Sequence, residues 1–130
     1  MVRCLACVAV LLLAGGARAA PCSGVDRHPL ISQAMSPAIA GQLGVKSLAI
    51  RQALWFGGWS VLEVAVPHGE PAFLFYRGDP AASRYLTLWA GAAAPSEEAA
   101  IRDWAVANAP GIPPVLAACF AAAVMPGSRR

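Results

Sequence analysis

Apolar residues recur in the first part of the chain at the spacing of an amphipathic helix. In the stretch LISQAMSPAIAGQLG, which follows Pro29, they occupy positions 31, 34, 35, 38, 39 and 43. Steps of three and four residues place such positions on one helical face, and Gly44 is a suitable stop. Because Pro37 lacks a backbone N–H and clashes with the preceding turn, we expect either a kinked helix or two short helices.

Two β-rich runs follow in KSLAIRQALWFGGWSVLEVAV, and the glycine pair at 57–58 between them predicts a hairpin. The length of the turn decides which side chains share a face. A two-residue turn at 57–58 would pair Leu54 with Val61. It would also set Gln52 against Glu63, which places polar groups on an otherwise apolar face.

A three-residue loop over 57–59 would instead pair Leu54 with Leu62 and Ile50 with Val66. This register gives the hairpin one apolar face, and for that reason we prefer it. In either register Gln52 remains a polar residue on the apolar face. The residues that the preferred register sends to the opposite, outer face are Arg51, Trp55, Val61 and Glu63.

Two further strands and two helices complete the pattern. The runs AFLFY and YLTLW are separated by the turn-rich segment RGDPAAS and extend the hairpin to four strands. Ser96 is a natural N-cap for a helix that ends near Asn108, and a last helix begins at Pro113 or Pro114. The predicted fold class is α+β, with an N-terminal helix, a four-stranded antiparallel meander and two C-terminal helices packed on one face. We assign residues 20–125 to a single domain and 126–130 to a flexible tail.

The first 19 residues have the features of a secretory signal peptide. Arg3 supplies a positive charge, 5–14 form an apolar run, and Ala17-Arg18-Ala19 is a small-x-small cleavage site. Cleavage after Ala19 is favoured over cleavage after Ala20, which would leave Pro21 as the first residue. The apolar run is about half of the ~20 residues that cross a bilayer, so we expect no membrane span after processing. The predicted localisation is secreted or periplasmic.

Signal removal changes the meaning of the four cysteines. Cys4 and Cys7 are lost with the leader, and Cys22 and Cys119 remain. In an oxidising compartment an even number of cysteines favours a disulfide, so we predict a Cys22–Cys119 bond. The alternative is two free thiols, with Cys119 serving as a small apolar residue in the last helix.

Charge and motif content exclude several classes of function. Loss of Arg3 and Arg18 lowers the net charge from +3 to +1, which removes the clustered basic face typical of nucleic-acid binding. The few charged residues imply an alanine-rich surface or one that self-associates. The chain has two histidine-carboxylate pairs, Asp26 with His28 and His68 with Glu70. Neither pair supplies the three or four ligands that a zinc site needs, so no metal site is predicted.

No cofactor or nucleotide motif is present, and no serine lies in a Gly-x-Ser-x-Gly elbow, so no catalytic residue is assigned. The Arg77-Gly78-Asp79 sequence is interpreted as a turn.

The aromatic residues of the predicted sheet suggest a function in binding. Alternation along strands sends some of them to the outer face, and tryptophan and arginine are frequent at binding hot spots. We therefore expect a binding module that contacts an envelope protein or a small apolar ligand through Arg51, Trp55, Trp59 and Glu63. The alternatives are a hydrolase-like enzyme using Glu63 or His68, and a self-associating structural protein of the envelope. It is also open whether another segment covers the outer face.

Overall fold

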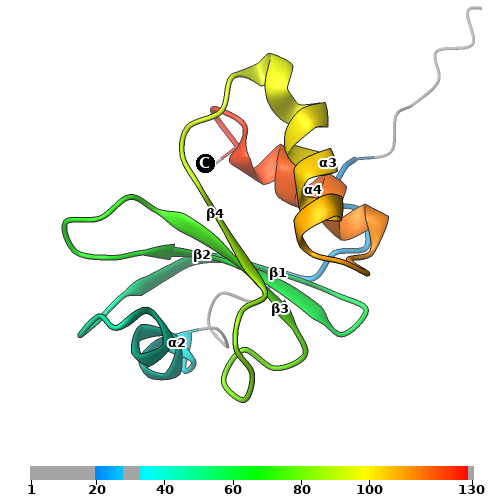
Figure 1. The fold of residues 1–130 in the computed structure, drawn as a ribbon. Coiled ribbons are helices and arrows are strands. Elements are labelled where there is room, and N and C mark those ends of the chain that lie inside the picture. The colour runs from blue at the N-terminus through cyan, green and yellow to red at the C-terminus, as the bar shows by residue number, and fades with distance from the viewer. Residues whose placement is uncertain (1–19, 28–32, 129–130) are drawn as a thin grey trace, which may run out of the picture.

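A computed structural model describes residues 20–27 and 33–128 of the chain. Helices and strands follow one another in the predicted order (Figure 1). The elements are α2 (Ser36–Leu43), β1 (Ala49–Phe56), β2 (Trp59–Ala65), β3 (Ala72–Arg77), β4 (Thr87–Ala90), the short 3₁₀ helix η1 (Pro95–Glu97), α3 (Glu98–Asn108) and α4 (Pro114–Val124).

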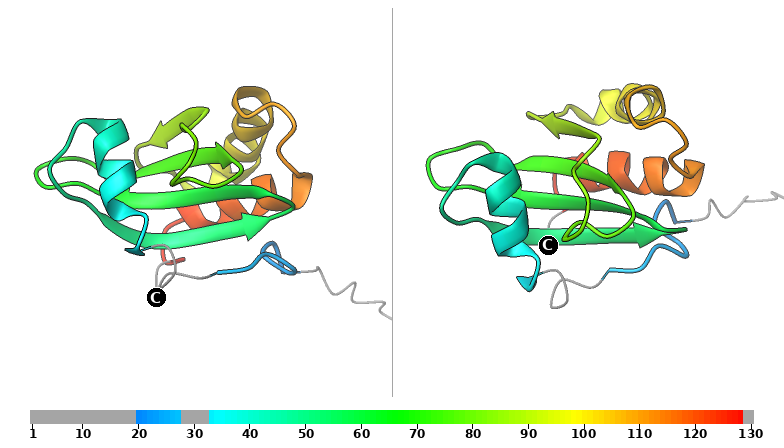
Figure 2. Two further views of the ribbon diagram at one scale, coloured as in Figure 1. Left: turned by 90° about the horizontal axis from the view of Figure 1, so that it is seen from below. Right: turned by 60° about the horizontal axis from the view of Figure 1, so that its bottom comes forward.

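The four strands form one antiparallel sheet in the order β1-β2-β3-β4. Helices α3 and α4 pack on one face of this sheet, whereas α2 lies against the opposite face (Figure 2). The α+β fold class and the meander are therefore confirmed. The position of α2 also answers the question left open by the sequence, because the face turned away from α3 and α4 is covered by the N-terminal helix.

Helix α2 begins later than the apolar spacing alone indicates. Pro37 lies in its first turn, where the missing N–H leaves no intrahelical bond unmade. Gly44 ends the helix with a φ of 67°, and its N–H donates to the carbonyls of Ala40 and Gly41. Proline therefore marks the start of this helix, which a turn at Ala34 and Met35 separates from the helical residue Gln33. Position 31 of the predicted apolar face lies outside the described residues.

The preferred register of the β1–β2 hairpin is wrong. The structure pairs Phe56 with Trp59 across a two-residue turn, so that Leu54 faces Val61 and not Leu62. Both turn glycines have positive φ, 56° at position 57 and 77° at position 58. Two consecutive positive φ values are the requirement of the tight type I′ turn, whose twist matches that of the strands it joins.

A β-bulge and a hydrogen bond remove the objection to this register. The pairing shifts between Ile50 and Gln52, which leaves Arg51 without a partner in the ladder. Ile50 consequently faces α2 opposite Val64, while Gln52 lies on the α3/α4 side. There its Nε2 donates to Oε2 of Glu63 at 2.6 Å, so the two polar groups that disfavoured this register satisfy each other.

Phe120 of α4 is the centre of the core between the sheet and the C-terminal helices. Its ring centroid lies 5.2 Å from that of Phe73 and 4.7 Å from that of Phe75, both in edge-to-face geometry. Trp89 and Trp104 complete the aromatic cluster at 6.0 Å and 6.4 Å from Phe120. Edge-to-face pairs of this kind add to the free energy gained by burying the rings.

The core on the α2 side is held by Gln42. Its Oε1 accepts a hydrogen bond from the Tyr76 hydroxyl at 2.9 Å, and its Nε2 donates to the carbonyls of Pro80 and Ser83 at 3.1 and 2.8 Å. One amide therefore connects the helix to β3 and to the loop before β4. The apolar residues buried on this side are Ile39, Ala40, Ile50, Ala53, Leu62, Val64, Ala72 and Leu74.

The C-terminal helices match the prediction except at one cap. Helix α3 ends at Asn108, and α4 begins at Pro114, as expected. Ser96, however, is not an N-cap, because it lies inside η1 and its hydroxyl makes no capping bond. The N-cap position of α3 is Glu97, which makes no side-chain capping bond there; its Oε2 instead accepts the N–H of Ala94, the N-cap residue of η1, at 2.7 Å.

The predicted disulfide between Cys22 and Cys119 is present and joins the N-terminal segment to the middle of α4. Cys119 is fully buried in the α3/α4 core, and Cys22 packs against the same cluster. A bond that spans 97 positions closes nearly the whole domain. The predicted signal peptide and its cleavage site after Ala19 lie outside the described residues.

Removal of this disulfide should destabilise the domain. For the double variant Cys22→Ala/Cys119→Ala we expect a loss of about 2–5 kcal/mol in the free energy of unfolding, because the unfolded chain regains the freedom that the bond removes. Urea denaturation of oxidised wild type and variant measures this loss. Wild type unfolded under reducing conditions is the control, and identical midpoints in all three samples would contradict the prediction.

Titration of Tyr76 should reduce stability at alkaline pH. Burial, with a smaller contribution from Tyr85, raises the pKa of Tyr76 from 10.0 to about 12. The unfolded chain loses this proton first, so stability should fall between these two pH values, by on the order of 1–2 kcal/mol. Urea denaturation at a series of pH values measures this fall in the free energy of unfolding. Tyr76→Phe should abolish it, and persistence of the same slope in that variant would assign it to other groups.

Ser60 should be replaceable by alanine with a gain in stability. The side chain is fully buried between Trp55 and Tyr76 of the neighbouring strands, and its Oγ has no hydrogen-bond partner among residues 20–27 and 33–128. We expect Ser60→Ala to raise the free energy of unfolding by about 1 kcal/mol, because a buried hydroxyl that bonds nothing is removed. Ser96→Ala is the matched control, because it removes an exposed hydroxyl that makes no capping bond. Urea denaturation of both variants gives the two changes in the free energy of unfolding. A loss of stability in Ser60→Ala would show that the hydroxyl is satisfied.

Candidate functional site

The end of the β1–β2 hairpin is built to hold its side chains in fixed positions. Gly57 and Gly58 allow the tight turn, and the N–H of Gly78 donates to the carbonyl of Gly58 at 2.8 Å. On the other side, Asp26 and Trp55 exchange two backbone hydrogen bonds of 3.0 and 2.9 Å. The tip is thus joined both to the turn after β3 and to the N-terminal segment.

Arg77 fixes Trp59 at the base of this tip. Its guanidinium carbon lies 4.9 Å from the centroid of the Trp59 ring, and its Nη2 donates to the carbonyl of Pro110 at 2.9 Å. Gly111 makes this approach possible, because a Cβ at that position would lie 2.5 Å from Nη2. The cation–π contact and the hydrogen bond together connect the hairpin to the segment between α3 and α4.

A hollow of about 420 Å³, here called the tip hollow, lies around the end of the hairpin. Its walls are largely apolar and aromatic, and two of its lining residues carry carboxylates. The lining residues are Asp26, Trp55, Phe56, Gly57, Gly58, Trp59, Gly78 and Asp79.

The structure brings together only two of the four residues predicted to form a binding face. Trp55 and Trp59 both line the tip hollow, although they lie on opposite faces of the sheet. Arg51 is exposed at the bulge near the other end of β1 and does not line the hollow. Glu63 is fully buried on the α3/α4 side, bonded to Gln52. The expected grouping assumed the three-residue loop, and the observed register separates its members.

Glu63 and His68, named for the enzyme alternative, occupy different environments. Glu63 lies in the core, whereas His68 is exposed in the turn between β2 and β3. His68 has a φ of 60°, the left-handed conformation that usually selects glycine in such a turn. Neither residue lines the tip hollow. Asp26 belongs to that hollow, and its expected neighbour His28 lies outside the described residues.

Sequence reasoning missed three residues of the tip hollow, Asp26, Phe56 and Asp79. Phe56 flanks the glycine pair and is 36% exposed, a position that the two-residue turn would have indicated. Arg77 is the last residue of β3, so the predicted turn covers only part of the Arg77-Gly78-Asp79 sequence; the turn follows from Asp79, whose Oδ1 accepts the N–H of Ala81 at 2.9 Å. Asp26 reaches the tip by pairing with β1 across 29 positions, which no local pattern encodes.

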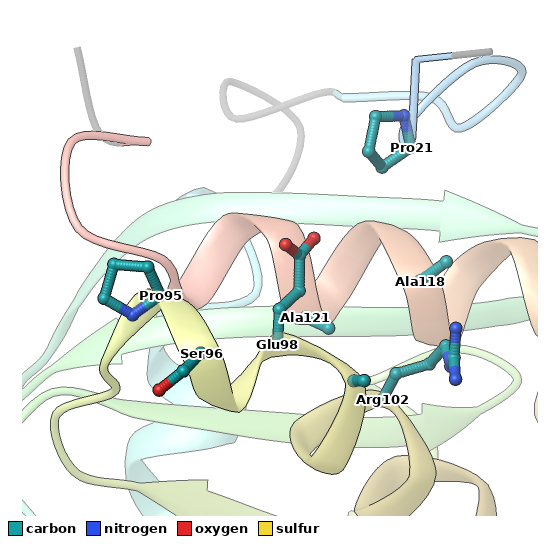
Figure 3. A pocket seen from close by; sticks show the side chains of 8 residues that line it. Pro21, Pro95, Ser96, Glu98, Arg102, Ala118 and Ala121 are labelled. Carbon is teal, nitrogen blue, oxygen red and sulfur yellow. The ribbon is translucent and has the colours of Figure 1, made fainter. Parts of the chain in front are cut away.

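A larger hollow of about 520 Å³ lies between α3, α4 and the N-terminal segment. Figure 3 shows Glu98 and Arg102 extending from α3 alongside α4, while the Ser96 hydroxyl points away from them. Alanines 99, 118 and 121 form much of the surface, and Arg102 pairs with Asp103 at 3.2 Å. Small side chains offer a ligand little contact area, so size alone does not make this hollow the better binding site.

The part of the chain that the structure describes contains no group of three or more histidine, cysteine, aspartate or glutamate side chains placed to hold a metal ion. Within residues 20–27 and 33–128, no helix has the length and apolarity required to cross a bilayer. The chemistry available at the tip hollow is therefore aromatic contact, backbone polarity and the negative charge of two carboxylates.

Comparisons of the chain with models of protein families, with curated proteins and with solved structures found no match.

Proposed function

We propose that this protein is an exported binding module of the cell envelope and that it contacts its ligand through the tip hollow. The observation that carries the proposal is the presence of Trp55, Phe56 and Trp59 around one hollow at the end of a rigid hairpin. Aromatic side chains bring large contact areas at a low cost in conformational entropy, which is why they dominate binding hot spots.

Export is supported by two independent features of the chain. Residues 1–19 have the charge, apolar run and small residues of a signal peptide. The Cys22–Cys119 disulfide is consistent with an oxidising compartment, where such bonds persist. We therefore propose secretion to the periplasm or the exterior.

The lining of the tip hollow indicates the class of ligand. Asp26 and Asp79 are the charged residues of the lining, and the remaining residues are aromatic or glycine. Carboxylates attract a positive charge, and aromatic rings accept both apolar groups and cations. The ligand would thus be an apolar group that carries a positive charge, either a basic side chain of an envelope protein or a small organic amine.

The rigidity of the tip supports a role in binding for its aromatic residues. Trp59 is fixed by the Arg77 guanidinium, and Trp55 by its two backbone bonds to Asp26. A surface that is ordered before the ligand arrives loses less conformational entropy on binding. The same contacts give the tip hollow a defined shape.

Phe56→Ala should weaken ligand capture without unfolding the protein, because this side chain is partly exposed and lines the hollow. With the mature, oxidised protein as bait in an envelope extract, we expect about tenfold less of the principal partner with the variant, typical of a hot-spot residue. Val106→Ala is the matched control, since Val106 is an exposed apolar residue of α3 outside the hollow. Equal capture by wild type and Phe56→Ala would reject the tip hollow as the contact surface.

The charge of the ligand can be tested separately by NMR titration with benzylamine, benzyl alcohol and benzoate. Benzylamine should shift the tip amides most and benzoate least, and the preference for the amine should diminish in Asp26→Asn. Equal shifts with all three probes would leave an apolar binding surface but contradict the proposed role of the carboxylates.

A further inference from the structure

The N-terminal segment, residues 20–27, is held against the domain by a disulfide and by a β-bridge. The Cys22–Cys119 bond joins it to α4. Four residues further along the chain, Asp26 pairs with Trp55 of β1 through two backbone hydrogen bonds. Figure 2 shows the segment, in blue, alongside β1. One short segment thus connects the disulfide to the end of the hairpin.

A tight turn connects Cys22 to Asp26. The N–H of Val25 donates to the carbonyl of Cys22 at 3.1 Å, and Gly24 has a φ of 80°. Glycine adopts this left-handed conformation without strain, so the turn can close. Because the two positions lie at the ends of one hydrogen-bonded turn, the disulfide that fixes Cys22 also places Asp26 beside β1.

Asp26 contributes to the tip hollow in two ways. Its side chain is one of the two carboxylates of the lining, together with that of Asp79. Its backbone also exchanges hydrogen bonds of 3.0 and 2.9 Å with Trp55, another lining residue. The tip hollow is therefore complete only while the N-terminal segment lies against β1.

Without the disulfide, few contacts would remain to hold the segment. Ordering a segment costs conformational entropy at every residue, and contacts must offset that cost. Cys22 and Val25 are half-buried against the α3/α4 core, whereas the other six residues of 20–27 are exposed. The hydrogen bonds of Asp26 lie at an exposed residue, where bonds to water replace them at little net cost. We therefore expect the segment to lose its order once the covalent bond is broken.

A reductant can reach the disulfide from the side of Cys22. This residue lines a hollow of about 270 Å³ whose wall also includes Arg27, whereas Cys119 is fully buried. The reactive form of an attacking thiol is the thiolate, and the positive charge of Arg27 favours its approach. Attack is therefore expected at Sγ of Cys22.

We propose that the Cys22–Cys119 disulfide is a redox-sensitive switch of the tip hollow, in which reduction by a dithiol releases residues 20–27 from β1. A thiolate of the dithiol attacks Sγ of Cys22, the disulfide breaks, and its electron pair passes to Sγ of Cys119, which takes up a proton. The second thiol of the dithiol then displaces Cys22, which also takes up a proton, and the dithiol leaves as a disulfide. Two electrons and two protons thus pass to the cysteines. The freed segment takes Asp26 out of the tip hollow.

Amide hydrogen exchange of the mature protein tests the release of the segment without any ligand. The oxidised protein is compared with the protein reduced by excess dithiothreitol. The N–H of Trp55, which donates to Asp26, should exchange at least about tenfold faster after reduction, whereas amides in the β2–β3 ladder should stay protected. The matched control is Cys22→Ala/Cys119→Ala, which should resemble the reduced protein and should not respond to dithiothreitol.

Two results of this experiment would overturn the proposal. A Trp55 amide that keeps its protection after reduction would show that the segment stays in place. Loss of protection throughout the β2–β3 ladder would show that reduction unfolds the domain and does not release one segment.

The consequence for binding rests on the function proposed for the tip hollow and is measured by NMR titration with benzylamine and benzoate. Reduction should weaken benzylamine binding and remove the preference for the amine over benzoate, because the carboxylate of Asp26 has left the hollow. An equal preference in oxidised and reduced protein would overturn the switch. If neither form binds benzylamine, the proposed function fails, while exchange at Trp55 still decides whether the segment is released.

Discussion

The two-residue turn at Gly57 and Gly58 sets the register of the β1–β2 hairpin, and the contacts of the two strands follow from that register. Because side chains alternate between the faces of a strand, a shift of one position would exchange the residues facing α2 with those facing α3 and α4. The bulge at Arg51 then moves Ile50 to the α2 side, where it packs in the core. One turn and one bulge thus supply apolar side chains to both faces of the sheet.

A sheet with two apolar faces must be packed against other segments on both sides, because both faces would otherwise be exposed to water. Helix α2 covers one face through Gln42 and Ile39, and α4 covers the other through Phe120. The disulfide of Cys119 adds the N-terminal segment to the second layer. The consequence is that the broad faces are largely covered by the protein itself, which leaves the ends and edges of the sheet for contact with other molecules.

One end of the sheet carries the surface proposed for such a contact. The tip hollow combines aromatic walls with the carboxylates of Asp26 and Asp79, and so would select a ligand by charge as well as by shape.

Local signals in the sequence determined much of this fold. Apolar periodicity indicated the helices, Gly57 and Gly58 indicated the hairpin, and the pair Pro113-Pro114 indicated the start of α4. The count of cysteines outside the predicted signal peptide indicated the Cys22–Cys119 bond. Each of these features depends on residues close in sequence or on simple composition, and periodicity of apolar residues records burial directly.

Only the tertiary structure decided which polar residues are buried and which residues meet at the tip. The sequence disfavoured the two-residue turn because it placed Gln52 and Glu63 on an apolar face, and their mutual hydrogen bond is visible only once the strands are paired. Asp26 reaches Trp55 by a backbone contact that leaves no trace in the local pattern. The free energy of a buried polar group depends on the partner it finds, and that partner is chosen by the packing of distant segments.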